Sequence, residues 1–306
     1  MPTVAVAGGS GHVGRTIVEV LGASKEHEVL VLGRSVPEKN KMDQAFVVVD
    51  YVDIEATAAL LKTRGVHTII SAIVIIDPPS SSSQVNLVRA AALSGTVRRF
   101  ITSEWSVPHS EDSALYVFRE AAVEALRETN LQWTRIVNGY FLDYYGLPYL
   151  KSYLTPFTFA VDIANKAAAI PGTGNDIVYF TYTFDVAKFV VALLGLSDWD
   201  ETTYCYGDKA TWNEILQLAE ESRGSKFTAS YDALEKLQKG EVTELPSHRE
   251  SYGFFPKPAL RGFLSLLGRY VVEGRFDIPA DKALNAKFTE IQTLKVKEAI
   301  ELWRGH

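Results

Sequence analysis

Three glycines near the start of the chain, Gly8, Gly11 and Gly14, have the type and spacing of a dinucleotide-binding turn. An apolar run at residues 4–7 predicts a buried strand before them, and apolar residues at helical spacing follow them. We expect Gly8 to allow a sharp turn, Gly11 to let the backbone approach a pyrophosphate, and Gly14 to let the helix pack closely. The helix N-terminus would then face the phosphates. The candidate contacts are Gly8, Ser10, Gly11, His12, Val13 and Gly14.

The second predicted strand, residues 28–33, ends in Arg34 and Ser35, and a polar loop is expected at residues 35–44. In this architecture the end of that strand faces the adenosine ribose. An acidic residue there accepts a hydrogen bond from the 2′-hydroxyl group, whereas an arginine pairs with a 2′-phosphate. Arg34 and Ser35 therefore favour NADP(H) over NAD(H). The alternative is that Arg34 is only a solvated charge at a strand end.

A third predicted strand, residues 45–49, is followed by Asp50 and Tyr51. A carboxylate and an aromatic ring at this position could hydrogen-bond to and stack on the adenine base. The alternative for Asp50 is a helix cap, because a helix is predicted to begin near Ile54. The residues themselves do not decide between these two roles.

Strand and helix patterns alternate through the first half of the chain with short links, which predicts an α/β fold with a doubly wound parallel sheet. Further strands are expected at residues 68–73, 99–103 and 132–137, and helices at 54–61, 84–94, 114–129, 212–221 and 231–239. The carboxyl ends of such strands line the ligand crevice, so their residues are candidates for cofactor or substrate contacts. They are Ser71, Ala72, Thr102, Ser103, Glu104, Trp105, Asn138 and Gly139. Residues 77–83, which are rich in proline and serine, follow the fourth strand and are expected to lie over the cofactor as either a mobile flap or a plain surface loop.

Eight aromatic residues lie between Tyr140 and Phe159, and a second aromatic segment follows at residues 251–258. This density predicts a pocket wall for a large, flat, apolar substrate, because aromatic rings supply rigid contact area with polar edges. We expect only about a third of the first group to touch ligand, with the others in the core. The candidate substrate contacts are Trp105, Phe141, Tyr144 and Phe254.

Composition excludes several classes of function. The 306 residues are 47% hydrophobic and 22% charged, with a net charge of −6, which is typical of a globular protein and not of a nucleic-acid-binding one. No apolar stretch is long enough to cross a bilayer. The single cysteine, Cys205, and the lack of metal-ligand spacing predict a reducing compartment and no structural metal. Because a strand is predicted at the very start, we expect no targeting segment and a cytoplasmic protein.

Several motifs together resemble the NmrA-like and isoflavone-reductase-like branch of the atypical short-chain dehydrogenases. They are Gly8–Gly14, Arg34, Phe100–Glu104, Trp133–Thr134, Asn138–Asp143, Gly172–Gly174, Tyr179–Val186 and Trp212–Leu216, which cover most of residues 1–230. The resemblance implies an NADP(H)-binding Rossmann domain at residues 1–155, to which residues 178–205 return. It also implies a smaller, discontinuous substrate-binding region at residues 156–177 and 206–306. The overall character of the sequence most resembles that of fungal members of this branch, many of which modify secondary metabolites.

The sequence departs from this family at the residue expected to move a proton. Tyr116 lacks the lysine four residues later that short-chain dehydrogenases pair with tyrosine, because Glu120 stands there. The lysine of the isoflavone-reductase-like pattern is replaced by Arg119. Arginine keeps its proton at any working pH, so Arg119 could orient cofactor or substrate but not act as a general acid or base.

A proton could instead come from one of five other side chains, each of which has an equally plausible structural role. They are Glu104, His109, Tyr116, Tyr140 and Asp143. An acceptor such as an iminium carbon would need no proton at the moment of hydride transfer.

Three functions fit these features. The first is an NADP(H)-dependent oxidoreductase that acts on a bulky aromatic or heterocyclic molecule. The second is an NADP(H)-binding cyclase that folds its substrate for a redox-linked cyclisation or a Diels–Alder cycloaddition in alkaloid biosynthesis. The third is a non-catalytic NADP(H)-sensing regulator with a protein partner. We expect a monomer or homodimer that binds a small molecule, and neither nucleic acid nor membrane.

Overall fold

The computed structural model describes residues 1–36 and 44–306, so residues 37–43 of the expected polar loop lie outside the described residues. The chain forms two compact units. Unit 1 comprises residues 1–137, 186–205 and 281–291. Unit 2 comprises residues 138–185, 206–280 and 292–306.

Unit 1 is built on a seven-stranded sheet with the order β11-β6-β5-β4-β1-β2-β3, in which every neighbouring pair is parallel. The strands are β1 (Thr3–Ala7), β2 (Glu28–Gly33), β3 (Ala45–Val48), β4 (Val66–Ser71), β5 (Arg99–Ser106), β6 (Gln132–Val137) and β11 (Thr202–Tyr204). The chain reverses direction across the sheet after β3, so the strands on either side of β1 are wound oppositely. This is the doubly wound Rossmann-type sheet that the sequence predicted.

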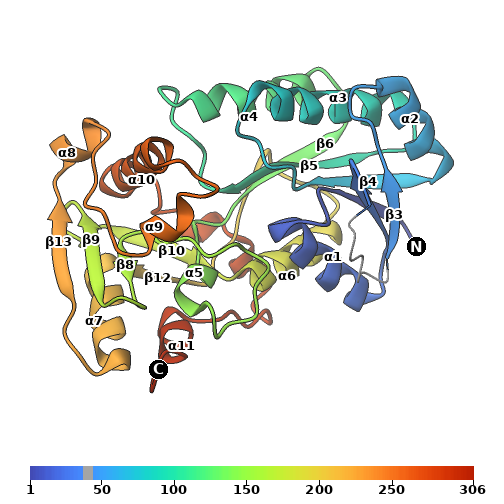
Figure 1. Cartoon of the computed structure of the whole chain (residues 1–306). Coiled ribbons are helices and arrows are strands. Elements are labelled where there is room, and N and C mark those ends of the chain that lie inside the picture. Colours follow the sequence, from blue (N-terminus) through green and yellow to red (C-terminus); the bar gives the residue numbers. More distant parts are fainter. Residues whose placement is uncertain (37–43) are drawn as a thin grey trace. The chain divides into compact units, whose positions relative to one another are not determined.

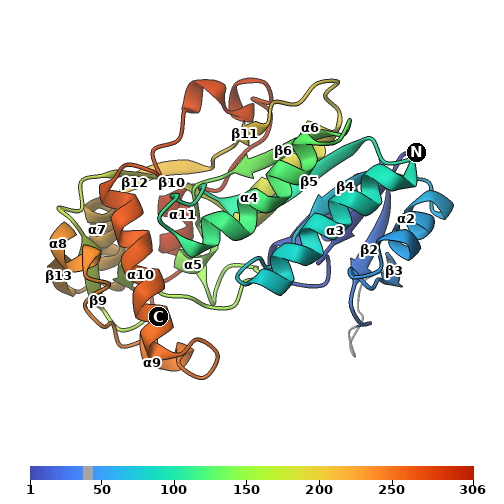
Figure 2. The same ribbon diagram turned by 90° about the horizontal axis from the view of Figure 1, so that it is seen from above.

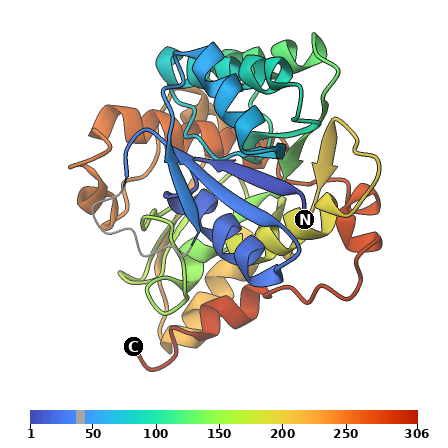
Figure 3. The ribbon, with the colours of Figure 1, turned by 90° about the vertical axis from the view of Figure 1, so that its right-hand side faces the viewer.

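Helices cover both faces of this sheet (Figures 1 and 3). One face carries α2 (Ile54–Thr63), α3 (Pro78–Ser94) and α4 (Ala114–Arg127), which lie side by side in Figure 2. The other face carries α1 (His12–Ser24) and α6 (Thr183–Leu194), and two short helical turns, Ala280–Lys282 and Leu284–Ala286, lie later in the chain. Apolar residues such as Leu32, Ile69 and Phe100 are fully buried because helices cover both sides of the strands.

Unit 2 contains two three-stranded sheets, with the orders β12-β10-β7 and β13-β9-β8. The strands are β7 (Tyr140–Phe141), β8 (Val161–Asp162), β9 (Ala167–Pro171), β10 (Ile177–Thr181), β12 (Asp208–Thr211) and β13 (Thr228–Asp232). Its helices are α5 (Asp143–Gly146), α7 (Trp212–Arg223), α8 (Leu234–Gln238), α9 (His248–Ser251), α10 (Lys257–Val272) and α11 (Val296–Glu301). Within the unit, α8 packs on α10 and α7 packs on α11.

The unit boundaries differ from the expected domain boundaries at three places. Residues 138–155 and 178–185 cluster with unit 2, and residues 281–291 return to unit 1. The reason is strand pairing, because β7 pairs with β10 and Tyr204, the last residue of β11, pairs with Ala283. Such pairings join segments that are far apart in the sequence.

Three expected elements are wrong. Residues 77–83 are not a loop, because α3 begins at Pro78 and includes all four serines. The side chain of Asp77 accepts the backbone N–H of Ser80 at 2.8 Å, and proline is tolerated in the first turn of a helix. The fourth strand begins and ends two residues earlier than expected, at Val66 and Ser71. The helix expected at 231–239 is split, because Tyr231 belongs to β13 and only Leu234–Gln238 is helical.

Candidate functional site

The three glycines of the first turn differ in what surrounds them. Gly8 has φ +76°, and a Cβ atom on it would lie 2.6 Å from the carbonyl oxygen of Ala72. A Cβ atom on Gly14 would lie 2.3 Å from the carbonyl oxygen of Gly8. At Gly11 the backbone is extended, and the nearest heavy atom to a Cβ atom would be that same oxygen at 3.9 Å. The protein's own packing therefore requires Gly8 and Gly14 but leaves space beside Gly11.

The space beside Gly11 belongs to a cavity of about 530 Å³ in unit 1. Its walls come from the carboxyl ends of β1, β2 and β4, so it lies where the parallel sheet predicts a ligand crevice. Eight predicted residues line it: Gly8, Ser10, Gly11, His12, Arg34, Ser35, Tyr51 and Ala72. Six other predicted residues of unit 1 do not: Val13, Gly14, Asp50, Ser71, Thr102 and Ser103.

Arg34 and Tyr51 are two of the polar residues that line this cavity beyond the glycine turn. Arg34 is exposed, and its positive charge acts on the Tyr51 side chain. Tyr51 is only 6% exposed, and its hydroxyl group has no hydrogen-bond partner among the described residues. Burial raises the pKa of Tyr51 well above its ordinary value, although the charge of Arg34 acts in the opposite direction. The phenol therefore stays protonated and can donate to a bound ligand.

Asp50 is not the cap of α2. Its Oδ1 atom accepts the backbone N–H of Val52 at 2.9 Å, and Asp53 caps the helix by accepting the N–H of Ala56 at 2.8 Å. The capping alternative for Asp50 is therefore wrong. Asp50 shapes the turn that places Tyr51 in the cavity wall.

The end of β2, the segment after β4 and the start of α3 contribute lining residues that the sequence analysis did not name singly, although it placed residues 77–83 over the cofactor as a flap or loop. These lining residues are Gly33, Ile73, Val74, Ile76, Asp77, Pro79, Ser80 and Ser83. Asp77 and Ser80 form a reciprocal capping box, which is a sequence signal for the start of a helix. The run of serines obscured that signal because serine is also common in loops.

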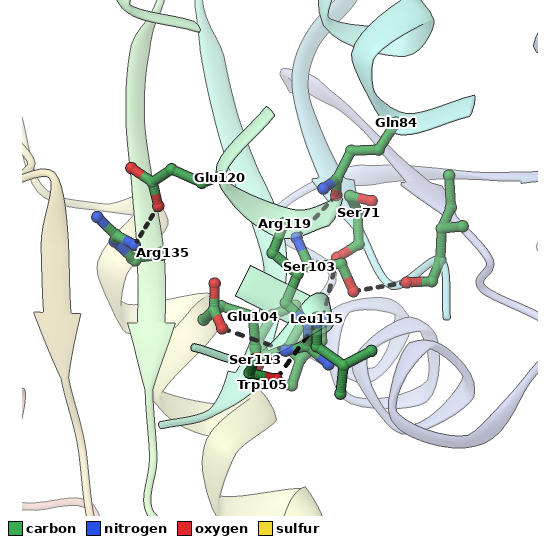
Figure 4. Close-up of polar contacts among 11 residues, drawn as sticks. Ser71, Gln84, Ser103, Glu104, Trp105, Ser113, Leu115, Arg119, Glu120 and Arg135 are labelled. Carbon is green, nitrogen blue, oxygen red and sulfur yellow. Dashed lines mark hydrogen bonds and ion pairs between the residues drawn. The ribbon is translucent and has the colours of Figure 1, made fainter. Parts of the chain in front are cut away.

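The carboxyl end of β5 carries a buried polar network (Figure 4). The backbone N–H of Ser103 donates to Gln84 Oε1 at 2.9 Å, and Ser103 Oγ donates to the carbonyl oxygen of Ile73 at 2.7 Å. The indole N–H of Trp105 donates to the carbonyl oxygen of Ser71 at 3.0 Å. Ser103 and Trp105 thus hold β5, β4 and α3 together, and both side chains are buried.

Three polar atoms near this network have no partner among the described residues: Ser71 Oγ, Gln84 Nε2 and Thr102 Oγ1.

Arg119 on α4 is held by Glu104 on β5. Its Nη1 atom donates to the carbonyl oxygen of Glu104 at 2.7 Å and to Oε1 of the same residue at 3.2 Å. Glu104 is 3% exposed, and burial raises its pKa, opposed by the charges of Arg119 and Arg135. Arg135 forms its own ion pair with Glu120 at 3.2 Å. Figure 4 shows both pairs, and the bonds to Glu104 fix Arg119 as an oriented cation. Tyr116 lies on the same helix and is half-buried.

The two candidate proton donors of unit 2 are tied into its interior. The Asp143 carboxylate accepts hydrogen bonds from Ser152 Oγ at 2.6 Å and Thr183 Oγ1 at 2.7 Å. Its other oxygen accepts the backbone N–H of Thr183 at 2.9 Å. Tyr140 is surrounded by other aromatic rings, and burial raises its pKa well above the ordinary value. Asp143 and Tyr140 therefore stabilise the fold of unit 2.

Asn138 and Gly139 begin unit 2 and form a tight turn. Gly139 has φ +72°, and a Cβ atom on it would lie 2.2 Å from the carbonyl oxygen of Tyr179. The carbonyl oxygen of Asn138 accepts the hydroxyl group of Thr181 at 2.5 Å. Both contacts position the turn against β10.

The aromatic run of residues 140–159 divides into two groups. Tyr140 and Phe159 pack with Phe180 and Trp212 in the core of unit 2. Three of the eight residues, Tyr144, Tyr145 and Phe157, line a cavity of about 400 Å³ within unit 2, and Phe254 lines it too. Phe141 does not line it, although its ring contacts that of Tyr144.

Neither a metal-binding cluster nor a membrane-spanning helix is found among the described residues. They contain no group of three or more histidine, cysteine, aspartate or glutamate side chains that could hold a metal ion. Within residues 1–36 and 44–306, no helix has the length and apolarity needed to cross a membrane.

Two curated relatives match most of the chain. "Oxidoreductase BOA1" of Botryotinia fuckeliana is 36% identical over 258 residues, which cover 82% of this chain and 84% of the relative. "Oxidoreductase swnN" of Metarhizium robertsii is 32% identical over 337 residues, which cover 97% of this chain and 96% of the relative.

Two solved structures share the fold. Leucoanthocyanidin reductase of Vitis vinifera, in a binary complex with NADPH, has a TM-score of 0.72 at 18% identity and covers 98% of each chain. AtPrR2 with NADP⁺ and (+)-pinoresinol has a TM-score of 0.73 at 20% identity, covering 99% of this chain and 98% of that chain. The NmrA-like family model matches residues 1–254. With the doubly wound sheet and its glycine turn, the family model and the two relatives show that the chain belongs to the NmrA-like family.

Proposed function

We propose that this NmrA-like oxidoreductase binds NADP(H) in the cavity of unit 1 and reduces a bulky aromatic or heterocyclic small molecule. The observation that carries the proposal is the open side of Gly11 in a cavity that also contains Arg34. Relatives of this chain are named oxidoreductases, and the two fold neighbours described above were solved with NADPH or NADP⁺. These features all support NADP(H) as the cofactor.

The residues of the cavity suit the parts of this dinucleotide. The missing side chain at Gly11 and the N-terminus of α1 would accept a pyrophosphate. Arg34 would pair with a 2′-phosphate, which NAD(H) lacks. The unpartnered hydroxyl group of Tyr51 would donate to the adenosine half. The Tyr51 hydroxyl group would thereby gain a partner that it lacks among the described residues.

Bound NADPH would supply a hydride, that is, one hydrogen with two electrons, to an electrophilic carbon of the substrate. With an iminium acceptor, the carbon gains the hydride and the electrons of the C=N bond become the nitrogen lone pair, so no proton is consumed. Such an acceptor suits a protein in which Arg119 cannot act as a general acid. It also suits one in which Asp143 and Tyr140 are held in the interior of unit 2.

Cyclisation is the second candidate function. It is favoured by the same replacement of the family's lysine by Arg119. A site in which Arg119 replaces the proton-transferring lysine would still bind a flexible substrate in a reactive shape. Stoichiometric consumption of NADPH, followed by its absorbance at 340 nm, separates the two, because net reduction oxidises one cofactor per product. A regulator would consume none.

The cofactor assignment is tested by calorimetry with NADPH and NADH on the wild type and Arg34→Ala. We expect the wild type to prefer NADPH, and Arg34→Ala to lose most of that preference, about 1.5–3 kcal/mol or roughly ten- to hundredfold in affinity. Arg64→Ala, which removes an exposed arginine outside the cavity, is the matched control and should change neither affinity. Equal affinity of the wild type for both nucleotides would refute the assignment.

A further inference from the structure

The cavity of about 400 Å³ in unit 2 combines aromatic walls with negative charge. Tyr144, Phe157 and Phe254 are among its aromatic lining residues, and Asp162 and Glu250 are its acidic lining residues. The lining includes no lysine, arginine or histidine. A ligand in this cavity would therefore meet two acidic groups and no basic one.

Asp162 is the deeper of the two acidic residues, with only 2% of its surface exposed. Four groups donate hydrogen bonds to its carboxylate: the backbone N–H and side-chain amide of Asn165, and the backbone N–H and hydroxyl group of Ser247. All four donors are neutral. Buried charges in proteins are normally paired with an opposite charge, yet no described cationic side chain forms an ion pair with Asp162.

Glu250 and Phe254 lie on the exposed side of the same cavity. Glu250 is exposed, and the Phe254 ring is 61% exposed despite its apolar character. Further along the wall, the rings of Tyr144 and Phe157 meet edge to face with centroids 5.7 Å apart. Aromatic faces attract cations through their negative electrostatic potential, and the attraction is strongest where water is excluded.

We propose that this cavity binds an organic cation, namely a flat apolar ring system that carries a positively charged nitrogen. The ring would lie against Tyr144, Phe157 and Phe254, and the charge would face Asp162 and Glu250. This inference rests on the proposed function, since it assigns an iminium ion as the substrate class of the oxidoreductase. An anionic substrate would be repelled, and a neutral one would gain only the apolar contacts.

The test compares two probes of nearly the same shape, N-methylquinolinium, which is cationic, and 1-methylnaphthalene, which is neutral. Calorimetry with the full-length protein titrated into each probe keeps the poorly soluble neutral probe dilute. We expect the cation to bind at least about tenfold more tightly in low salt. We expect Glu250→Gln to weaken cation binding about three- to fivefold and to leave binding of the neutral probe unchanged. Glu235→Gln, which removes an exposed carboxylate of unit 2 outside the cavity, should leave both unchanged.

The outcomes separate this inference from the cofactor assignment. Equal affinity for the two probes, or tighter binding of 1-methylnaphthalene, would overturn the cation site. A Glu250→Gln variant that stays folded by circular dichroism and binds the cation as tightly as the wild type would overturn the role of Glu250. NADPH affinity is measured on the same samples. Normal NADPH binding without a preference for the cation would reject only the substrate class, whereas the reverse result would reject only the cofactor.

Discussion

Replacing Gly11 with alanine isolates ligand binding from folding. The backbone at Gly11 is extended, with φ −111° and ψ 152°, a conformation that alanine adopts without strain. The added Cβ atom would meet protein only at 3.9 Å, an ordinary van der Waals distance. Alanine is a poorer helix N-cap than glycine, at a cost of about 0.5–1 kcal/mol. The reduced freedom of the unfolded chain offsets about 0.4–1 kcal/mol of that cost. We therefore expect the free energy of unfolding to change by less than about 1 kcal/mol.

The same methyl group would occupy the space through which backbone must approach a pyrophosphate. NADPH affinity should therefore fall by at least about tenfold, or ~1.4 kcal/mol. Calorimetry measures the affinity, and urea denaturation followed by circular dichroism measures stability.

Two further glycine substitutions serve as controls for Gly11→Ala. Gly262→Ala lies in unit 2, where a Cβ atom has nothing within 4 Å, and should leave NADPH affinity unchanged. Gly14→Ala should instead lose stability, because its Cβ atom would lie 2.3 Å from the Gly8 carbonyl oxygen. If Gly11→Ala stays folded and binds NADPH like the wild type, the pyrophosphate does not lie against this turn.

Two further predictions concern the pair of Glu104 and Arg119. Burial raises the pKa of Glu104 above its ordinary value of 4.5, so above that pH the folded state holds more protons than the unfolded state, and the contribution of Glu104 to stability falls as pH rises. Urea denaturation between pH 4 and 8 measures the free energy of unfolding of the wild type and of Glu104→Gln. The wild-type value should decline relative to that of the variant as pH rises. A difference between the two that does not change with pH would contradict this prediction. Because arginine does not titrate below pH ~12, Arg119→Gln should lower activity but keep any ionisation seen between about pH 6 and 9 in the rate profile. Loss of one defined ionisation in Arg119→Gln, with substrate affinity unchanged, would show that Arg119 is not a fixed orienting cation, and Arg119→Lys should keep partial activity.

Short-range patterns in the sequence were enough to predict the parallel sheet of unit 1. Strands such as β1 and β2 are apolar on both faces, and the residues between them repeat at helical spacing. The glycine turn was also predictable, because the conformational demand at Gly8 and the close packing at Gly14 arise within or next to the turn. Such features depend mainly on residues that are close together in the sequence.

The same local reasoning failed where two signals compete. Residues 78–83 contain two prolines and four serines, which are typical of loops, yet they form the first turns of α3. The Asp77 cap and the bond from Ser81 Oγ to the carbonyl oxygen of Phe118 on α4, at 2.7 Å, support the helix. The first contact is visible in the sequence, but the second requires two helices to pack together.

The sequence by itself determined the fold class and the residue types of the candidate cofactor site. Only the tertiary structure decided which candidate side chains are accessible and which are tied down. Arg119 is fixed by Glu104, fifteen residues away, and Asp143 by Thr183, forty residues away. The acidic, aromatic cavity likewise joins Asp162 with Glu250. Burial and pairing between such distant positions depend on how the whole chain folds, and no periodicity or local propensity encodes them.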